Sequence, residues 1–423
     1  MLLVTCLLAF YLAWNLGAND VANSMGTSVG SKAVSLKNAL IIAAVLEFTG
    51  AVLFGREVSE TLASRVFNPI RFVQTPQTLL IGMVAVLVAC GLWLHLATTF
   101  GLPASSSHAV VGALAGFAWK AGGPVAVDWL SIGWISLIWV VTPLISGAIA
   151  ALFYSLLRVW VLQQANPLAQ LQEWIPWLST ALTGVVGGIV LPPLFQTELA
   201  ADLPVPPHTL ALMISAIATL GLTLFAWRNL ESHFMARTAL ATPSSGYSPL
   251  ERLMARFQLF SAGCVAFAHG SNDVGNAIAP VAVVLGLLDQ GRIAGANFAV
   301  PVWLLGLGGV GIVAGLATGG QKVIATVGEG IIPLQPSSGF CAELATAATV
   351  LLASRLGLPV STSHALVGAV IGIGLVQSWR SVRLQTLTSI GLVWVVTIPI
   401  AALLSAIVFF LGLQVTGPFL TSL

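Results

Sequence analysis

The chain has 423 residues, of which 57% are hydrophobic and 7% are charged, and its formal net charge is +2 at pH 7. The mean hydropathy of +0.97 excludes a soluble globular protein and predicts an all-α membrane protein that crosses the bilayer many times. The few Lys and Arg residues are scattered over short connections, so they indicate membrane orientation rather than affinity for nucleic acid.

Ten long apolar runs follow one another along the chain, and each is long enough to cross a membrane as a helix. The first run starts at an N-terminus without the basic region and cleavage site of a signal peptide, so we expect it to be a membrane element. The ten predicted spans are 2–18, 38–55, 78–99, 131–156, 178–195, 208–227, 257–287, 297–318, 339–354 and 387–413.

Two further apolar pieces, 103–118 and 359–376, are shorter, and each begins at a Gly-Leu-Pro sequence that is followed by hydroxyl residues. Non-helical backbone at membrane depth is tolerated only where protein or a polar cavity surrounds it. These pieces are therefore predicted to be re-entrant elements.

The chain contains two copies of one pattern. GANDVANSMGT from Gly17 corresponds to GSNDVGNAIAP from Gly270, and GLPASSSHAVVGALAG from Gly101 corresponds to GLPVSTSHALVGAVIG from Gly357. Two more pairs keep the same order: GREVSETL with GQKVIATV, and WVVTPLISGAIAALF with WVVTIPIAALLSAIVFF. Four matches in one order indicate a duplicated unit. Duplicated halves with polar interruptions are typical of secondary transporters that bind their substrate between the repeats.

The duplication divides the chain into four predicted parts. These are the first repeat (1–160), two spans without a counterpart (161–227), a linker (228–256) and the second repeat (257–423). The linker, RNLESHFMARTALATPSSGYSPLERLMAR, is polar and basic and is predicted to be cytoplasmic. The repeats are inverted if each Gly-Leu-Pro element crosses the membrane and parallel if it returns, and the distribution of basic residues slightly favours inversion.

Both copies of the Gly-x-Asn-Asp motif place a carboxylate at membrane depth. The glycine permits a break in the helix, and Asn residues four apart share one helical face with the Asp beside them. Hard cations prefer such oxygen ligands, and an ionisable residue inside a membrane is functional by default. The alternative is that the Asp side chains cap half-helices. The candidate ligands for sodium or a proton are Asn19, Asp20, Asn23, Asn272, Asp273 and Asn276.

A hydroxyl cluster follows each Gly-Leu-Pro sequence. The proline can open a helix, so hydroxyl groups and free backbone N–H groups converge at the positive end of a helix dipole. This arrangement predicts an anion cradle, with helix capping as the alternative. The candidate anion-binding residues are Ser105, Ser106, Ser107, Ser361, Thr362 and Ser363.

The paired Asn-Asp motifs and the paired Gly-Leu-Pro-x-Ser-x-Ser-His motifs resemble those of the inorganic phosphate transporter (PiT) family of sodium- or proton-coupled permeases. The resemblance covers nearly the whole chain and implies phosphate as the anion and a homodimer in the plasma or inner membrane. Four positions depart from the usual family residues without removing a polar group: Gly275, Ala279, Ser107 and Ser363. The family includes sulfate permeases, so sulfate is an alternative anion.

The two Asn-Asp motifs and the two Gly-Leu-Pro motifs contain no Lys or Arg, so another group must compensate the charge of a bound anion. Two ionised aspartates would repel phosphate by on the order of several kcal/mol, even at an effective dielectric of about 20. A cation must therefore enter with the anion: either sodium at Asp20 and Asp273 or protons on the same carboxyl groups, and the many oxygens favour sodium. The chain is thus predicted to be a phosphate symporter without other cofactors, and a passive anion channel is the remaining alternative.

Two more carboxylates, Glu47 and Glu343, lie in apolar runs at positions that do not correspond between the repeats. Each is a candidate ligand for a coupling ion, and a buried glutamate bonded to a neighbouring helix is the alternative. His108 and His364 end the hydroxyl motifs and either relay protons or orient a backbone carbonyl. An enzyme is not expected, because Ser107 and His108 are adjacent and point apart on a helix, and the same pair occurs in both halves.

Overall fold

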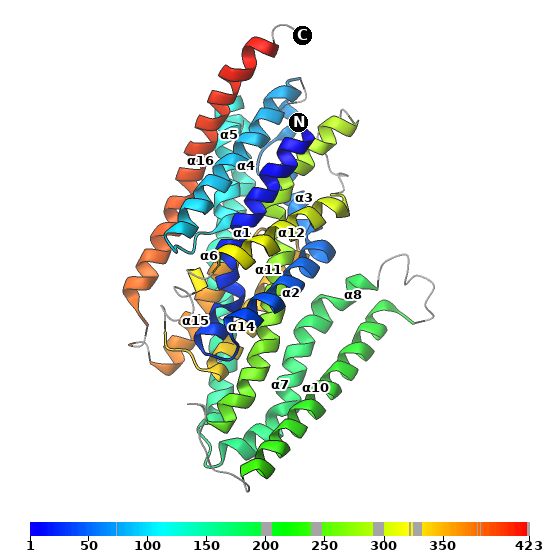
Figure 1. The fold of residues 1–423 in the computed structure, drawn as a ribbon, viewed down its shortest axis with the longest axis vertical. Helices are drawn as coiled ribbons and strands as arrows, with labels where there is room; N and C mark the ends of the chain where they lie inside the picture. Colours follow the sequence, from blue (N-terminus) through cyan, green and yellow to red (C-terminus); the bar gives the residue numbers. More distant parts are fainter. Residues whose placement is uncertain are drawn as a thin grey trace.

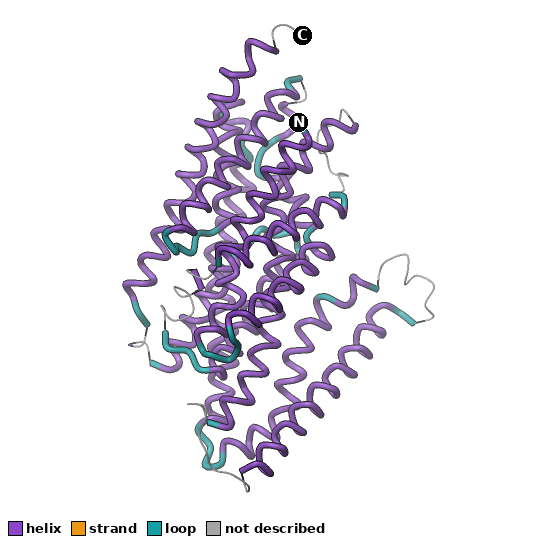
Figure 2. Tube along the Cα trace, viewed as in Figure 1, coloured by secondary structure: helices purple, strands orange, loops and turns teal. Residues whose placement is uncertain are grey.

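A computed structural model of the chain describes residues 1–72, 74–195, 205–237, 248–290, 300–320, 323–324, 332–378, 380 and 382–420. In these ranges the regular secondary structure is helical (Figure 2), apart from one isolated β-bridge between Phe67 and Val127. The all-α fold expected from composition is confirmed.

The helices follow the order of the apolar runs, with short connections between them. In the first half they are α1 (Leu2–Gly30), α2 (Leu36–Phe54), α3 (Arg56–Arg65), η1 (Pro69–Phe72), α4 (Pro76–Thr99), α5 (Ser106–Gly122), η2 (Pro124–Ala126), α6 (Trp129–Leu157) and η3 (Arg158–Leu162). The middle of the chain forms α7 (Pro167–Ile189), α8 (Leu191–Leu194) and α10 (Pro207–Arg237). The second half forms α11 (Pro249–Gln290), α12 (Val302–Gly319), α14 (Pro336–Arg355), α15 (Thr362–Gln377) and α16 (Leu384–Leu420).

Nine helices within the described ranges are long and apolar enough to cross a membrane. They correspond to nine of the ten spans predicted from the sequence. The tenth predicted span, 178–195, covers the end of α7 and the short α8; α7 itself begins earlier, at Pro167, and is not one of the nine. The protein is therefore a multi-pass membrane protein, as expected.

The predicted linker, 228–256, is helical at both described ends. Helix α10 continues to Arg237, and α11 begins at Pro249, eight residues before the predicted start of the second repeat. Residues 238–247 lie outside the described residues. The cytoplasmic location of this connection stays a prediction.

Helices α1 and α11 run without interruption through the Asn-Asp motifs. The helix breaks expected at Gly17 and Gly270 are therefore wrong. These glycines serve close packing instead: a Cβ at Gly17 would meet the Ile312 carbonyl of α12, and one at Gly270 would meet the Glu47 carbonyl of α2. Small residues allow membrane helices to approach closely, which explains the glycine without a break.

The helical path does break at the two Gly-Leu-Pro sequences. Gly101 and Gly357 have φ angles of +67° and +65°, a backbone conformation that glycine adopts without strain. Helices α5 and α15 then begin at Ser106 and Thr362, where the sequence places the two shorter elements. The re-entrant path of these elements stays a prediction.

The two halves exchange packing partners. Helix α1 packs on α12 while its counterpart α11 packs on α2, and α5 packs on α16 while α15 packs on α6 (Figure 1). The contacts use corresponding glycines: Gly112 and Gly116 of α5 face α16, as Gly368 and Gly372 of α15 face α6. This reciprocity supports the duplication read from the sequence, and it makes each half incomplete without the other. The opposite membrane orientation of the halves stays a prediction.

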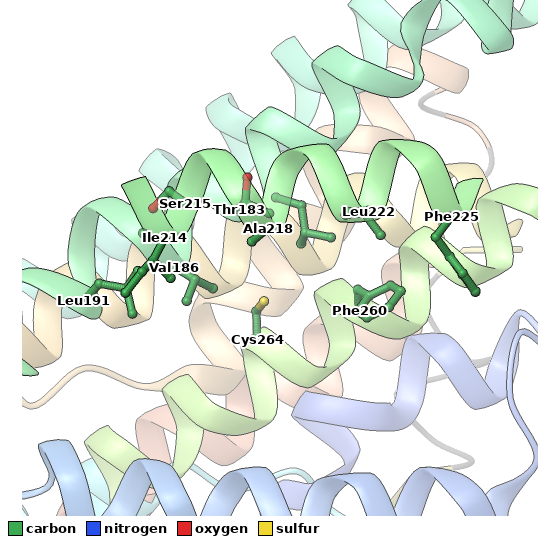
Figure 3. A pocket seen from close by; sticks show the side chains of 13 residues that line it. Thr183, Val186, Leu191, Ile214, Ser215, Ala218, Leu222, Phe225, Phe260 and Cys264 are labelled. Atoms are coloured by element: carbon green, nitrogen blue, oxygen red, sulfur yellow. The ribbon is translucent and has the colours of Figure 1, made fainter. Parts of the chain in front are cut away.

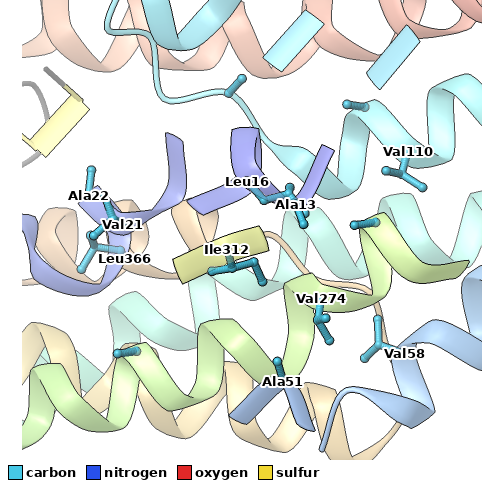
Figure 4. Packing of buried hydrophobic residues seen from close by; sticks show 14 of the residues in the cluster. Ala13, Leu16, Val21, Ala22, Ala51, Val58, Val110, Val274, Ile312 and Leu366 are labelled. Atoms are coloured by element: carbon cyan, nitrogen blue, oxygen red, sulfur yellow. The ribbon is translucent and has the colours of Figure 1, made fainter. Parts of the chain in front are cut away.

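The motif helices occupy the centre of the molecule. The apolar window of α11 is 94% buried and that of α14 is 89% buried, whereas α7 and α10 pack on each other at the flank (Figure 1). Leu16 of α1, Val274 of α11 and Ile312 of α12 are among the apolar side chains packed beside the motifs (Figure 4). Polar groups at this place are therefore enclosed by hydrocarbon.

We expect Gly372→Ala to lower the free energy of unfolding by about 1–3 kcal/mol, the usual effect of overpacking. The added Cβ would meet the backbone carbonyl of Gly147, which cannot turn aside as a side chain can. Gly391→Ala is the matched control, because no atom of the described residues lies within 4 Å of a Cβ there. Thermal unfolding of the purified variants in detergent measures the effect, and equal melting temperatures would contradict the packing argument.

Candidate functional site

The six Asn and Asp side chains predicted as cation ligands lie together on α1 and α11, and none is more than 2% exposed. They stand in the middle of continuous helices. A side chain in mid-helix cannot cap a helix end, so the capping alternative is excluded for the two aspartates.

His269 of α11 completes this cluster, although the sequence patterns did not point to it. Its Nε2 lies 3.0 Å from Asp273 Oδ2 and 3.9 Å from Asp20 Oδ2, and its Nδ1 lies 3.1 Å from Glu47 Oε2. Among the described residues, it is the only basic side chain within ion-pair distance of these carboxylates. His269 stands one helical turn before Asp273, and this spacing is the sequence signal that could have identified it. The first half has Leu16 at the equivalent position, so comparing the repeats did not reveal the histidine.

Three helices contribute to the acidic cluster. Glu47 of α2 accepts a hydrogen bond from the Ser24 hydroxyl of α1 at 2.9 Å, and the Asn23 amide donates to Asp20 Oδ1 at 2.9 Å. Glu47 is thus brought together with the predicted cation ligands. Its role in coupling stays a prediction.

The first asparagine of each motif is held in the same way in both halves. Asn19 Nδ2 donates to the Thr98 hydroxyl at 3.0 Å and to the Leu102 carbonyl at 2.9 Å. Asn272 Nδ2 makes the equivalent bonds to the Ser354 hydroxyl and the Leu358 carbonyl, both at 3.1 Å. The amide N–H groups are therefore used to fix the Gly-Leu-Pro turns, and the amide oxygens remain for another partner.

Several buried oxygens of the cluster accept no hydrogen bond from any residue that the structure describes. Buried polar atoms without a partner are rare, and their cost is removed when a ligand binds. These oxygens are acceptors, so a cation fits them. One oxygen each from Asp20 and Asp273 and a ring nitrogen of His269 lie within 4.8 Å of one another, close enough to hold one ion. The unpartnered oxygens are Asn19 Oδ1, Asp20 Oδ2, Glu47 Oε2, Asn272 Oδ1, Asp273 Oδ1 and Asn276 Oδ1.

The predicted anion cradle meets the cation cluster at Asp273. The hydroxyls of Ser106 and Thr362 lie 3.5 Å and 3.4 Å from Asp273 Oδ2. Asn276 Nδ2 donates to the hydroxyls of Ser106 and Ser107, at 3.3 Å and 3.4 Å. The first turns of α5 and α15, which come from different halves, therefore converge on the same motif of α11.

The remaining hydroxyls make local bonds. Ser105 and Ser361 cap α5 and α15, each accepting a 3.3 Å bond from the backbone N–H of the histidine three residues later, His108 or His364. The Ser363 hydroxyl pairs with that of Ser361 at 3.0 Å. Capping is what the structure shows for Ser105 and Ser361, and a contact of these residues with the anion stays a prediction.

Glu343 of α14 lies in a second buried polar cluster. It accepts hydrogen bonds from the hydroxyls of Thr27 and Ser28 at 2.6 Å each, from Ser261 at 2.7 Å and from the Gln258 amide at 3.1 Å. Glu343 thereby joins α14 to α1 and α11, which matches the alternative of a glutamate bonded to neighbouring helices. A role in coupling stays a prediction.

His108 and His364 contact backbone carbonyls, which is one of the two roles expected from the sequence. The Nδ1 atom of each lies 3.1 Å from the carbonyl oxygen of a tryptophan, Trp394 for His108 and Trp139 for His364. Because a carbonyl only accepts, Nδ1 carries the hydrogen in both rings.

Two apolar cavities lie apart from this site. One, of about 520 Å³, lies between α7, α10 and α11 (Figure 3), and one of about 440 Å³ continues from it toward α2 and α14. The hydroxyls that line the first, Thr183 and Ser215, already donate to carbonyls of their own helices. These cavities therefore offer no free polar group for an anion.

Comparison with known proteins gives one consistent answer. The phosphate transporter family profile matches residues 16–405. The chain is 40% identical to the "Putative phosphate permease" of Haemophilus influenzae over 96% of this chain and 95% of that protein. It is 38% identical to the chloroplastic inorganic phosphate transporter 2-1 of Arabidopsis thaliana, over 95% of this chain and 70% of that one. A solved structure named "The sodium-dependent phosphate transporter" superimposes with a TM-score of 0.84 at 34% identity, covering 97% of this chain and 98% of the other.

Proposed function

Since the chain belongs to the phosphate transporter family, whose members are transporters rather than enzymes, we propose that it is a symporter that carries inorganic phosphate across the membrane together with sodium ions. The observation that carries the proposal is the buried cluster of Asp20, Glu47 and Asp273, whose oxygens include acceptors without a donor. A cation satisfies these acceptors and neutralises the carboxylates at the same time.

Charge explains why the two substrates move together. Three carboxylates face one imidazole, that of His269, so an entering phosphate meets repulsion of on the order of several kcal/mol. A cation bound at Asp20 and a cation bound at Asp273 remove this repulsion. Phosphate then binds well only to the cation-loaded protein. The difference in phosphate affinity between the cation-loaded and the cation-free protein is the coupling free energy between the two sites.

The oxygen-rich ligand set supports sodium, a hard cation that prefers oxygen ligands. The similar protein of known structure, named as a sodium-dependent phosphate transporter, supports the same choice. His269 favours a second candidate, proton coupling, because an imidazole among carboxylates offers a group that can carry a proton.

The anion is proposed to bind where the hydroxyls of Ser106, Ser107 and Thr362 meet the free N–H groups at the start of α5 and α15. Helix N-termini favour anions, and the hydroxyls supply further donors. Ser105, Ser361 and Ser363 belong to the same cradle in this proposal. The two halves are proposed to be inverted repeats that expose this site alternately to the two sides, within a homodimer.

Phosphate uptake into proteoliposomes under an imposed sodium gradient, compared with an imposed pH gradient, tests the proposal. We expect the inward sodium gradient to drive accumulation of labelled phosphate, with the pH gradient alone adding little. Accumulation driven by the pH gradient in sodium-free buffer would show that protons, rather than sodium ions, are the coupling ions. Equal uptake without either gradient would indicate a passive channel and overturn symport.

Arsenate is expected to compete for uptake, whereas equimolar sulfate is expected to compete poorly. Arsenate has the shape and the protonation states of phosphate, and a cradle of hydroxyls and N–H groups does not distinguish the two. Initial uptake rates of labelled phosphate at increasing competitor concentration measure this. Strong inhibition by sulfate with weak inhibition by arsenate would assign the chain to sulfate transport.

A further inference from the structure

The two halves are held together by a pair of crossed hydrogen bonds that are the same in both directions. His108 packs against Trp139 of its own half, with ring centroids 3.9 Å apart, and donates to the Trp394 carbonyl of the other half at 3.1 Å. His364 packs against Trp394, with ring centroids 3.7 Å apart, and donates to the Trp139 carbonyl at 3.1 Å. The histidine rings lie 4.7 Å apart, so the four aromatic rings form one cluster between the repeats.

Beside this symmetric cluster, one set of contacts is made in one direction only. The Trp139 indole Nε1–H donates to the Pro359 carbonyl at 2.9 Å, and the Ser107 hydroxyl donates to the Val360 carbonyl at 2.8 Å. Both acceptors belong to the Gly-Leu-Pro segment of the second half. The first half therefore holds the turn that precedes α15.

The equivalent contacts in the other direction are absent from the described part of the chain. Trp394 Nε1 is buried and has no hydrogen-bond partner among the described residues, although its counterpart Trp139 has one. The Ser363 hydroxyl pairs with Ser361 within its own turn, rather than with the carbonyl of Ala104. A buried indole N–H without a partner is rare in folded proteins, and here the repeat identifies the acceptor that it lacks, the carbonyl of Pro103.

From this broken symmetry, and resting on the proposed transport function, we propose that Trp139 and Trp394 are positioning residues that hold the opposite half's Gly-Leu-Pro segment in alternation during the cycle. In the state described here Trp139 is engaged and Trp394 is released. In the opposite state Trp394 donates to Pro103 and Ser363 donates to Ala104, while Trp139 is released.

Alternating access between two related halves gives this exchange a physical basis. When two repeats swap conformations, contacts on the axis between them persist and contacts off the axis exchange partners. The crossed histidine bonds are the persistent contacts. The tryptophan contacts change partners. Ser107 and Ser363 change with them, so the exchange alters which hydroxyl of the anion cradle is bonded to the opposite half's Gly-Leu-Pro segment.

Hydrogen exchange of the purified protein tests the inference without any transport measurement. Trp139→Phe keeps an aromatic ring against His108 but removes the indole donor to Pro359, so exchange should rise in residues 357–361 and fall in 101–105. Trp394→Phe removes the donor of the opposite state only, so exchange in 357–361 should fall. A shift of roughly two- to tenfold is expected, the range for one hydrogen bond. Trp394→Phe loses no hydrogen bond in this structure, so it carries the test if Trp139→Phe does not fold.

The double variant and a matched control separate a switch from general damage. In the double variant each state loses one donor, so the fall in exchange at 101–105 that Trp139→Phe alone produces should disappear. Exchange at 357–361 should stay raised, because Trp139 no longer holds this segment. Trp129→Phe is the control: its indole also donates to a proline carbonyl, that of Pro124 at 2.8 Å, but on the exposed surface, and no change in either segment is expected.

Uptake measurements then connect the switch to transport. The two single variants should move the apparent KM for external phosphate in opposite directions, because they favour opposite states, and the double variant should lie near the wild type. Shifts of both single variants in the same direction, or additive damage in the double variant, would overturn the inference. Lack of phosphate uptake by the wild-type protein would overturn the proposed function instead, while the exchange experiment would still decide the switch.

Discussion

Asp20→Asn and Asp273→Asn are each expected to abolish cation-coupled phosphate uptake while the protein still folds. Asparagine keeps the size of the side chain and much of its hydrogen bonding, but it removes the charge that attracts the cation. At about 4 Å and an effective dielectric of about 20, one charge pair contributes about 4 kcal/mol, roughly a thousandfold in cation affinity. The phosphate beside the cluster then loses its compensating charge.

Asp128→Asn is the matched control for these two variants. Asp128 caps α6 by accepting a 3.0 Å bond from the Ser131 N–H, and asparagine caps helices as well as aspartate does. Proteoliposome uptake at several sodium concentrations measures the effect, and elution from a size-exclusion column checks folding. Uptake with unchanged cation dependence in both cluster variants would remove the carboxylates from the mechanism.

Glu343→Ala is expected to destabilise the protein strongly, by about 3 kcal/mol or more. Four donors from α1 and α11 lose their shared acceptor in a place without solvent, and each unsatisfied buried group costs about 1–3 kcal/mol. Glu343→Gln keeps one acceptor oxygen and should cost less. Glu173→Ala, at an exposed position of α7, is the control.

Thermal unfolding in detergent distinguishes these outcomes. A melting temperature that falls in the order Glu173→Ala, Glu343→Gln, Glu343→Ala is the expected result. If Glu343→Ala is as stable as the control but does not transport, the carboxylate acts on a transported ion rather than on the packing of α1, α11 and α14.

Much of the candidate site was predictable because its residues are repeated in the sequence. Asp20 and Asp273, with the asparagines beside them, were found from a polar interruption that occurs twice in apolar runs. The structure places them in one buried cluster with the hydroxyls of Ser106 and Thr362, as the transporter hypothesis requires. His269 was not predicted, because it has no counterpart in the first half and the prediction relied on repeated residues.

The helix break expected at Gly17 and Gly270 shows where local reading failed. A glycine beside polar residues is equally compatible with a helix break and with close helix packing. The sequence does not determine which atom lies opposite the glycine. The structure shows a backbone carbonyl of another helix opposite each glycine, so helix packing decides the question. The same limit applies to Glu343, whose four donors lie on helices distant in the sequence.

Hydropathy, repetition and motif chemistry are properties of short segments, so they were enough to identify a duplicated membrane transporter with carboxylates inside its apolar segments. The packed helices were needed to show that α1 and α11 are continuous and that His269 and Glu47 join the two aspartates. They were also needed to show that the Trp139 indole has a hydrogen-bond partner, while that of Trp394 has none in the described part of the chain. These facts depend on which helices contact each other and on how each helix is rotated about its own axis. Both are determined by the packing of all the helices together.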